Sequence, residues 1–387
     1  MLKVLGRVYV SLACGLLAVA VALSIVDALT GSPPVASPSA GLAGIPYYER
    51  QSWTARFIAD QEGVGTGKVH YEPFTVWRRP PYASETVNVG PDRLRVVPGS
   101  DCSPGAKKVW FFGGSTMWGT SSPDGGTIPA LFLSGMRERS TTATCVRNFG
   151  EGAWGSTQEV IELVRALQRG EVPDVAVFYD GANDLDLAFD NGDPYGHAEL
   201  PRITALFERE GRGRGARRAP ERSLRELLRW FAPGLAGRLD AARPLRARNG
   251  RRRQGDPELV LEAIRVLRVN REIVRGIATR FGFAAHFFWQ PCLLAGRKPL
   301  APGEQAILAR EKRRVPAFLE MVEQANVLVA DGGKPDETDL SRVFEGTTEQ
   351  VYTDPVHVTP QGNEIVARAI LAVLGDRVAG GPRAGGR

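Results

Sequence analysis

The sequence predicts an α/β protein with three layers, in which helices cover both faces of a doubly wound parallel sheet. Short, uninterrupted apolar runs recur along the 387 residues, and amphipathic segments lie between them. Such runs suit strands that are buried on both faces, and their alternation with helices is typical of βαβ units. Hydrophobic residues make up 43% of the chain and charged residues 24%, a balance that excludes a disordered or fibrous protein.

Five apolar runs are the expected strands, and the last of them is the weakest. They are Lys108–Gly113, Val146–Gly150, Asp174–Asp180, Ala284–Trp289 and Val327–Ala330. In an open sheet of this type, ligands bind beyond the carboxyl ends of the strands. The residues that directly follow these runs are therefore the first candidates for chemistry.

Three other segments have the features of amphipathic helices. Thr157–Arg169 carries apolar residues three and four positions apart. Pro257–Phe281 is longer, and Asp256 before it is a typical N-cap residue. The pair Thr359-Pro360 repeats this start signal ahead of a helix at Ile365–Leu374. Helices and strands thus alternate, as a doubly wound sheet requires.

Residues 1–30 are expected to form a transmembrane anchor. Lys3 and Arg7 precede an apolar run, Val8–Leu29, whose 22 residues include one charge, Asp27. A helix of this length spans the roughly 30 Å hydrocarbon core of a bilayer, whereas the core of a signal peptide is shorter. A cleaved signal remains the alternative. In either case the positive flank stays in the cytoplasm, so the rest of the chain is expected at the cell surface or, after cleavage, as a secreted protein.

The parts that flank the expected catalytic domain have distinct compositions. Residues 31–44 are predicted to be a flexible linker, and residues 379–387 a flexible tail. Residues 45–105 are rich in Tyr, Trp, Pro and Arg without a helical period, which indicates an irregular extension with short strands.

The four cysteines favour a structural role over a metal or redox role. The chain has no Cys-x-x-Cys, which excludes a zinc ribbon or a thioredoxin-type site. Cys102 lies just before the first expected strand and Cys145 begins the second. If these strands are parallel neighbours, the two cysteines can bridge in an oxidising compartment, and the alternative is two buried free thiols. No metal or organic cofactor is implied.

Four short blocks hold the candidate catalytic residues. Ser115 lies in a glycine-rich turn after the first strand, and a second glycine-rich loop, residues 150–157, follows the second strand. Asn183 follows the third strand, and Asp354 precedes His357 by three positions near the end of the chain. A carboxylate at this spacing can hold the Nδ1 proton of the ring and leave Nε2 free to activate a serine. Each block taken alone is also common in turns and helix caps.

Together, and in this order, the blocks resemble those of the SGNH hydrolase superfamily, the GDSL esterases. That family has a Ser in a GDS-type turn, a Gly, the Asn of G-x-N-D, and a D-x-x-H near the C-terminus. The resemblance covers roughly residues 106–190 and 255–375. It implies a flavodoxin-like sheet in a hydrolase domain over residues 106–378, interrupted by an insert at about 198–254.

The resemblance also implies a role for each matching residue. Ser115 matches the nucleophile, His357 the general base, and Asp354 the residue that orients the imidazole. The amide of Ser115 and the side-chain amide of Asn183 match two donors to the oxyanion. The third donor is a backbone amide of the second block.

Two positions depart from the family pattern. The Asp of GDS is Gly114 in this chain, and that Asp is not part of the triad. In the second block an ungapped alignment places Ala153 where the family has its glycine. The family uses the backbone N–H there, which alanine retains, and a shifted loop would present Gly152 instead. Both positions stay open as the third donor.

These features predict a membrane-anchored serine acyl ester hydrolase that acts outside the cytoplasm. The expected substrates are O-acyl esters of small molecules or of envelope polysaccharide or lipid. One alternative is an O-acyltransferase with the same triad, and another is a non-catalytic carbohydrate-binding module. Trp118 and Trp154 flank the site in sequence and either stack on a sugar or pack in the core. His70, His197 and His286 are expected to be structural.

The insert concentrates the positive charge of the chain. Residues 202–253 hold sixteen arginines and five acidic residues, whereas the whole chain carries +6. Residues Glu221–Leu239 could form an amphipathic helix. The insert is either a solvated helical excursion or a surface for anionic lipid or anionic envelope polymer. Nucleic acid is not an expected partner, because export would separate the chain from it.

Overall fold

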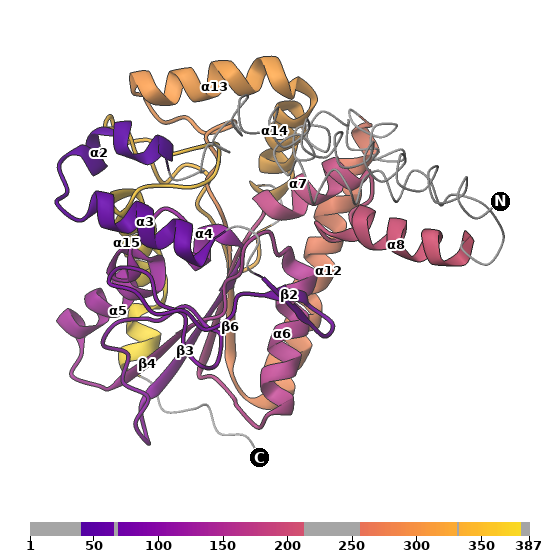
Figure 1. Ribbon diagram of the computed structural model, residues 1–387. Helices are drawn as coiled ribbons and strands as arrows, with labels where there is room; N and C mark the ends of the chain where they lie inside the picture. The colour runs from indigo at the N-terminus through magenta and orange to yellow at the C-terminus, as the bar shows by residue number, and fades with distance from the viewer. Residues whose placement is uncertain (1–39, 66–68, 213–255, 331–332, 381–387) are drawn as a thin grey trace, which may run out of the picture. The chain divides into compact units, whose positions relative to one another are not determined.

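The computed structural model describes residues 40–65, 69–212, 256–330 and 333–380 (Figure 1). The expected anchor at residues 1–30, most of the expected linker, the helix at Glu221–Leu239 and most of the expected tail lie outside these residues. Within the described ranges, no helix is both long and apolar enough to cross a bilayer. Residues 40–65, 69–201, 256–330 and 333–380 belong to one compact unit.

The centre of this unit is a sheet of five strands, all of them parallel. The strands are β3 (Lys107–Gly113), β4 (Thr144–Asn148), β5 (Val175–Asp180), β6 (Ala284–Trp289) and β7 (Glu337–Asp339). Their order across the sheet is β4-β3-β5-β6-β7. This is the 2-1-3-4-5 order of flavodoxin-like sheets, whose switch point lies between the first and third strands. The predicted doubly wound parallel sheet is confirmed.

The expected fifth strand is wrong. Val327–Ala330 belongs to helix α14 (Pro316–Ala330), in which Val327 is 62% exposed and Ala325 is buried. The fifth strand is β7, an edge strand that pairs only with β6. Its three residues are Glu, Thr and Asp, and it therefore has none of the apolar character that a strand buried on both faces shows.

Helices cover the two faces of the sheet, as Figure 1 shows. Helices α5 (Ile128–Arg139) and α15 (Pro360–Gly380) pack on one face, and α6 (Ser156–Gln168) and α12 (Pro257–Phe281) pack on the other. Further helices are α4 (Ser115–Trp118), α7 (Ala182–Asn191), α8 (Leu200–Arg212), α13 (Pro302–Arg314) and α14, with 3-10 turns η1 (Ala40–Gly44) and η2 (Asp124–Gly126).

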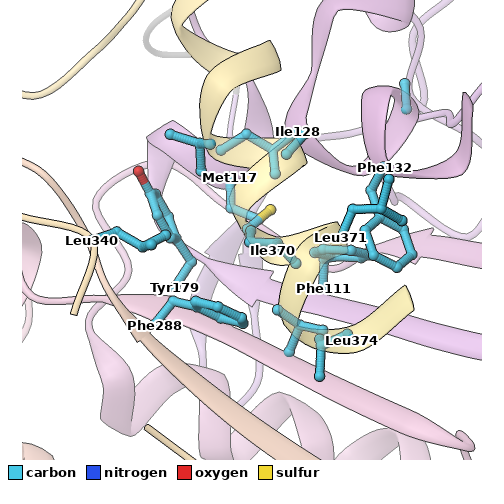
Figure 2. Close-up of a cluster of buried hydrophobic side chains, with 14 of the residues drawn as sticks. Phe111, Met117, Ile128, Phe132, Tyr179, Phe288, Leu340, Ile370, Leu371 and Leu374 are labelled. Carbon is cyan, nitrogen blue, oxygen red and sulfur yellow. The ribbon is translucent and has the colours of Figure 1, made fainter. Parts of the chain in front are cut away.

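The alternation of side chains along the strands builds a separate core on each face. Phe111 in β3 packs with Phe132 of α5 and Ile370 of α15 (Figure 2). The next residue, Phe112, belongs to the opposite core and stacks on Phe178 with ring centroids 4.8 Å apart. Strand residues buried on both sides explain why β3, β5 and β6 read as largely apolar runs.

The helix starts expected from the sequence are confirmed. Asp256 caps α12, because its carboxylate accepts a hydrogen bond from the Glu258 amide at 3.0 Å. At the start of α15, Thr359 Oγ1 accepts from the Gly362 amide at 3.2 Å. This second cap fixes the direction in which the chain leaves the loop at residues 351–359, which holds the D-x-x-H block.

The N-terminal segment, residues 40–97, is more regular than its sequence suggests. It contains α2 (Pro46–Glu49), α3 (Thr54–Val64) and an antiparallel hairpin of β1 (His70–Glu72) and β2 (Val76–Arg78). The end of the expected linker forms η1, whose Leu42 is buried. The segment shares a buried apolar cluster with Trp118, which follows the Ser115 turn. It therefore packs directly beside the candidate site.

A disulfide joins Cys102 to Cys145, whose Cα atoms are 4.4 Å apart. The bond forms because β3 and β4 are parallel neighbours, which is the condition set by the sequence analysis. The alternative of two free thiols is wrong. Cys292 is buried and free.

Candidate active site

Ser115 lies at the carboxyl edge of the sheet, next to the switch point. Strand β3 ends at Gly113, and Ser115 begins the short helix α4. The helix ends at Gly119, whose φ of 89° is left-handed and suits glycine. The amide of Ser115 donates to no other group in the described part of the chain. The turn thus presents both a hydroxyl and a free N–H at the edge where ligands bind.

The structure brings Ser115, His357 and Asp354 into one hydrogen-bonded line. Ser115 Oγ lies 2.7 Å from His357 Nε2. On the other side of the ring, His357 Nδ1 lies 2.6 Å from Asp354 Oδ2. With the proton on Nδ1 donated to the carboxylate, Nε2 is free to accept the serine proton. The predicted nucleophile, base and orienting carboxylate therefore lie in the geometry that a serine triad needs.

The environment of Asp354 keeps its carboxylate charged. Burial alone would raise the pKa of this carboxyl, but the attraction of His357 and the hydrogen bonds to it outweigh burial and lower the pKa. The bonds come from the ring and from the amides of Val356 and His357, which donate to Oδ1 at 2.9 and 2.7 Å. A fixed negative charge beside Nδ1 favours the imidazolium that forms when Nε2 takes a proton.

Asn183 reaches the site from the first turn of α7. Its Nδ2 donates to the carbonyl of Trp154 at 2.7 Å, which orients the amide and leaves its second N–H for another acceptor. The chain can turn here because Gly181 has a φ of 129°, and a Cβ at Gly181 would lie 2.6 Å from the Trp289 ring. The side chain of Asn183 therefore joins the loop that follows β4 to the turn that follows β5.

The departure at Gly114 has a structural reason. A Cβ built on Gly114 would overlap Asn183 Nδ2, and it would lie 3.0 Å from Asn183 Cγ and 3.3 Å from the carbonyl oxygen of Trp154. In this chain, Asn183 occupies the space that a side chain at position 114 would need. Any side chain at residue 114 would therefore move Asn183 from the place where it is observed.

In the loop that follows β4, the backbone amide of Ala153 is the one available to donate a hydrogen bond to the oxyanion. The Gly152 amide already donates to Glu151 Oε1 at 2.8 Å, so a shifted loop that offers Gly152 does not fit this arrangement. The Ala153 amide has no hydrogen-bond partner among the described residues. Ala153 has a φ of 59°, which is uncommon for a residue other than glycine.

Sequence reasoning missed the residues that hold this loop. Trp77 of β2 donates through Nε1 to the Gly152 carbonyl at 2.9 Å. Arg79 pairs with Glu151 through its guanidinium, and its amide donates to Glu151 Oε2 at 3.0 Å. Both lie in the segment that the sequence predicts to be irregular, because it shows no helical period.

Of the two alternatives left open by the sequence, core packing is confirmed for Trp118 and Trp154. Their side chains are 1% and 0% exposed. The guanidinium groups of Arg79 and Arg95 lie over the ring of Trp118, 4.1 and 4.3 Å from its centroid. Arg78 lies 4.7 Å from the centroid of Trp154. Arginines of the N-terminal segment therefore cover the faces that a sugar would use.

A buried acidic network lies behind Asn183. Burial raises the pKa of Asp180, at the end of β5, to about 7. Burial and the charge of Asp180 raise the pKa of Glu159 in α6 well above its ordinary value. Asp184 accepts from the amide and hydroxyl of Ser156 at 3.1 and 2.6 Å. This last pair is a further tie between the loop of the second block and the start of α7.

The other histidines do not join the triad. His286 in β6 is buried, and its Nε2 lies 2.8 Å from Thr338 Oγ1. His70 is exposed in β1, and the ring of His197 lies 6.0 Å from that of Trp77. Over residues 40–65, 69–212, 256–330 and 333–380, no group of three or more His, Cys, Asp or Glu side chains is placed to hold a metal ion.

Among the known proteins compared with this chain, only solved structures match it. No protein-family model matches the chain, and no curated protein sequence matches it. An acetyl xylan esterase, AlAXEase, is 13% identical, with 69% of this chain and 99% of that chain covered and a TM-score of 0.34. The lipase Lip_vut3 from a goat rumen metagenome is 14% identical, with 70% and 100% covered and a TM-score of 0.38. A member of the lipolytic protein G-D-S-L family from Veillonella parvula is 12% identical, with 69% and 98% covered and a TM-score of 0.31.

Proposed function

We propose that this chain is a serine-dependent acyl ester hydrolase of the SGNH type that acts outside the cytoplasm. One observation carries the proposal, namely the unbroken line from Ser115 Oγ through His357 to Asp354, with hydrogen-bond distances of 2.7 and 2.6 Å. A serine is a poor nucleophile unless a base lies within hydrogen-bonding reach. Here the base is present and is itself oriented by a charged carboxylate.

In the first half of the reaction, the acyl group passes from the substrate to Ser115. Ser115 Oγ bonds to the ester carbonyl carbon while its proton moves to His357 Nε2. The carbonyl oxygen becomes an oxyanion, to which the side chain of Asn183 and the amides of Ser115 and Ala153 donate. The tetrahedral intermediate then expels the alcohol, whose oxygen takes the proton from His357, and acyl-serine remains.

In the second half, water releases the acyl group. A water oxygen attacks the acyl carbon while His357 Nε2 takes one of its protons. The same donors stabilise the second oxyanion. The bond to Ser115 Oγ then breaks, Oγ regains the proton from His357, and the carboxylic acid leaves. Asp354 stays ionised throughout and stabilises the imidazolium in both halves.

The proposed substrates are O-acyl groups on envelope polysaccharide or lipid. The Cys102–Cys145 disulfide supports an oxidising compartment. The apolar run at Val8–Leu29 supports an anchor that keeps the site near the membrane. Both features support a site that lies where acylated envelope polymers and lipids are within reach.

Ester hydrolysis by the purified full-length chain tests the activity. We expect the chain to release p-nitrophenol from a series of p-nitrophenyl esters of increasing acyl length, and Ser115→Ala to abolish the release. Ser103→Ala is the matched control, because Ser103 is exposed and lies before the start of β3, whereas Ser115 follows the end of that strand. Equal hydrolysis by wild type and Ser115→Ala would overturn the proposal.

The location and the natural substrate need separate tests. In intact cells, we expect an added protease that does not cross the membrane to cleave the catalytic domain. Acetylated envelope polysaccharide should lose acetate on incubation with wild type and not with Ser115→Ala. A protected domain would contradict the proposed location, and acetate release at the same rate by both proteins would contradict the substrate class.

A further inference from the structure

The peptide unit between Gly152 and Ala153 is held by the N-terminal segment. Trp77 Nε1 donates to the Gly152 carbonyl oxygen at 2.9 Å. Trp77 is 7% exposed, so water competes little for this bond. The Gly152 C=O and the Ala153 N–H belong to one planar trans peptide and point in opposite directions. A bond that fixes the carbonyl therefore fixes the direction of the Ala153 N–H, which points away from Trp77.

The backbone of Ala153 needs such support. Its φ of 59° is left-handed, and a residue with a Cβ adopts this conformation only at a cost in free energy. Strained backbone of this kind persists only where the surroundings determine it. A free loop would relax, and the direction of the Ala153 N–H would be lost.

A second pair of residues holds the same loop one position earlier. Glu151 is 1% exposed and accepts from the guanidinium and the amide of Arg79. Its Oε1 also accepts from the Gly152 amide at 2.8 Å. Glu151 thus connects β2 to the loop, and the Arg79 guanidinium is in turn stacked on the ring of Trp118.

The far side of the loop faces the catalytic turn. The Trp154 carbonyl accepts from Asn183 Nδ2 at 2.7 Å and lies 3.3 Å from the position of a Cβ on Gly114. The loop therefore lies between β2, which holds it, and the residues around Ser115, which it serves.

We propose that Trp77 is a positioning residue for the oxyanion hole, with the Arg79–Glu151 pair as its support. Trp77 touches neither substrate nor the reacting atoms. It acts by fixing the peptide whose N–H, that of Ala153, donates to the oxyanion. The inference rests on the proposed ester hydrolase function and adds that residues 76–79 are a functional part of the site.

The substitution Trp77→Phe tests the proposal, because it keeps an aromatic ring and removes the N–H donor. We expect kcat to fall by about 10- to 100-fold, somewhat less than the loss of a whole oxyanion donor. KM should stay within about twofold, because the oxyanion exists only after attack. A trifluoromethyl ketone forms a tetrahedral oxyanion on the serine, so its inhibition constant should rise by about the same factor as kcat falls.

Trp110→Phe is the matched control. Trp110 is 1% exposed in β3, and its Nε1 has no hydrogen-bond partner among the described residues. The same substitution there removes similar volume and no hydrogen bond. We expect its kcat and its inhibition constant to stay at the wild-type values, even if its melting temperature falls. Wild type, Trp77→Phe and Trp110→Phe are measured side by side as full-length chains.

The outcomes separate this inference from the proposed function. If wild type hydrolyses the ester and Trp77→Phe matches it in kcat, the role of Trp77 is overturned and the hydrolase stands. An equal loss of kcat in Trp110→Phe would also overturn it, because the effect would then be one of packing. If wild type itself is inactive, the proposed function fails and the inference with it.

A second variant covers the case in which Trp77→Phe does not fold. Glu151→Gln keeps the size of the side chain but removes the charge that pairs with Arg79, and its NH2 group cannot accept the hydrogen bonds that one of the two carboxylate oxygens accepts. We expect a fall in kcat of about tenfold, again with KM unchanged and the trifluoromethyl ketone bound more weakly. A folded Glu151→Gln with wild-type kcat and inhibition constant would overturn the proposal.

Discussion

The side chain of Asn183 occupies the space that a side chain on Gly114 would need. A Cβ on Gly114 would overlap Asn183 Nδ2 and lie 3.0 Å from Asn183 Cγ. A side chain at position 114, immediately before the nucleophile, would therefore move Asn183 from the position in which it donates to the Trp154 carbonyl at 2.7 Å. The residue by which this chain departs from the G-D-S pattern is part of how its own site is assembled.

Gly114→Ala should therefore damage catalysis more than stability. The added methyl group must displace Asn183, and the loss of one oxyanion donor lowers kcat by about 100-fold or more. Gly125→Ala is the control, because a Cβ on Gly125 meets no atom within 4 Å. Steady-state kinetics and thermal melts of both variants check the expectation. Wild-type kcat in Gly114→Ala would contradict the assigned role of Asn183.

Asp354→Asn should remove most of the activity while the fold is kept. The amide cannot supply the charge that stabilises the imidazolium, and its NH2 group favours the wrong tautomer of His357. By analogy with serine triads in general, kcat should fall by about 10⁴-fold. The pKa of Asp354 is lower in the folded chain than its ordinary value. The ionised carboxylate therefore also stabilises the fold at any pH above that ordinary value. This stabilisation is lost as the pH falls through the lowered pKa. Kinetics at neutral pH decide the point, and a loss of less than tenfold would argue against a triad.

His286 should make the fold sensitive to mild acid. Burial lowers the pKa of His286 to about 4, against an ordinary value of 6.5. Between these values the unfolded chain binds a proton that the folded chain does not, so stability falls as the pH drops from 6.5 to 4. The melting temperature of His286→Gln should change less across this range than that of wild type. His70→Gln replaces an exposed histidine and should keep the wild-type slope, and identical slopes in all three proteins would refute the assignment.

The Cys102–Cys145 disulfide should support stability without taking part in catalysis. It joins residues separated by 43 positions, for which the loss of chain entropy in the unfolded state is worth about 4 kcal/mol. Reduction should lower the free energy of unfolding by up to this amount and leave KM unchanged. A double variant, Cys102→Ala with Cys145→Ala, should melt at one temperature with or without reductant. A wild-type melt that reductant does not alter would show that the bond is absent.

The sequence predicts the sheet and the triad because both depend on local signals. Strands β3, β5 and β6 are buried on both faces, so each reads as a largely apolar run. Parallel strands bring their carboxyl ends to one edge, which places the turn at Ser115 and the turn at Asn183 together. The edge strand β7 escapes prediction because it is short and polar. The sequence instead predicts the fifth strand at Val327–Ala330, because a short apolar run is equally typical of a strand and of part of a helix.

The support of the oxyanion loop could not be predicted, because it depends on contacts between distant positions. Trp77 and Gly152 are 75 positions apart, and Arg79 and Glu151 are 72 apart. No periodic pattern marks the segment that carries Trp77 and Arg79. The choice between Gly152 and Ala153 as donor likewise depends on which amide is already bonded. Only the folded chain shows that Gly152 donates to Glu151.

The most direct test of the account is to ask whether Ser115 is an activated nucleophile. The purified full-length chain is treated with a fluorophosphonate probe, and the adduct is located by mass spectrometry of its peptides. We predict a single adduct on Ser115, which lies 2.7 Å from His357 Nε2, and its loss in folded His357→Ala. A folded wild-type chain that carries no adduct on Ser115, or a His357→Ala variant that is labelled as fast as wild type, would contradict the triad on which the proposed function depends.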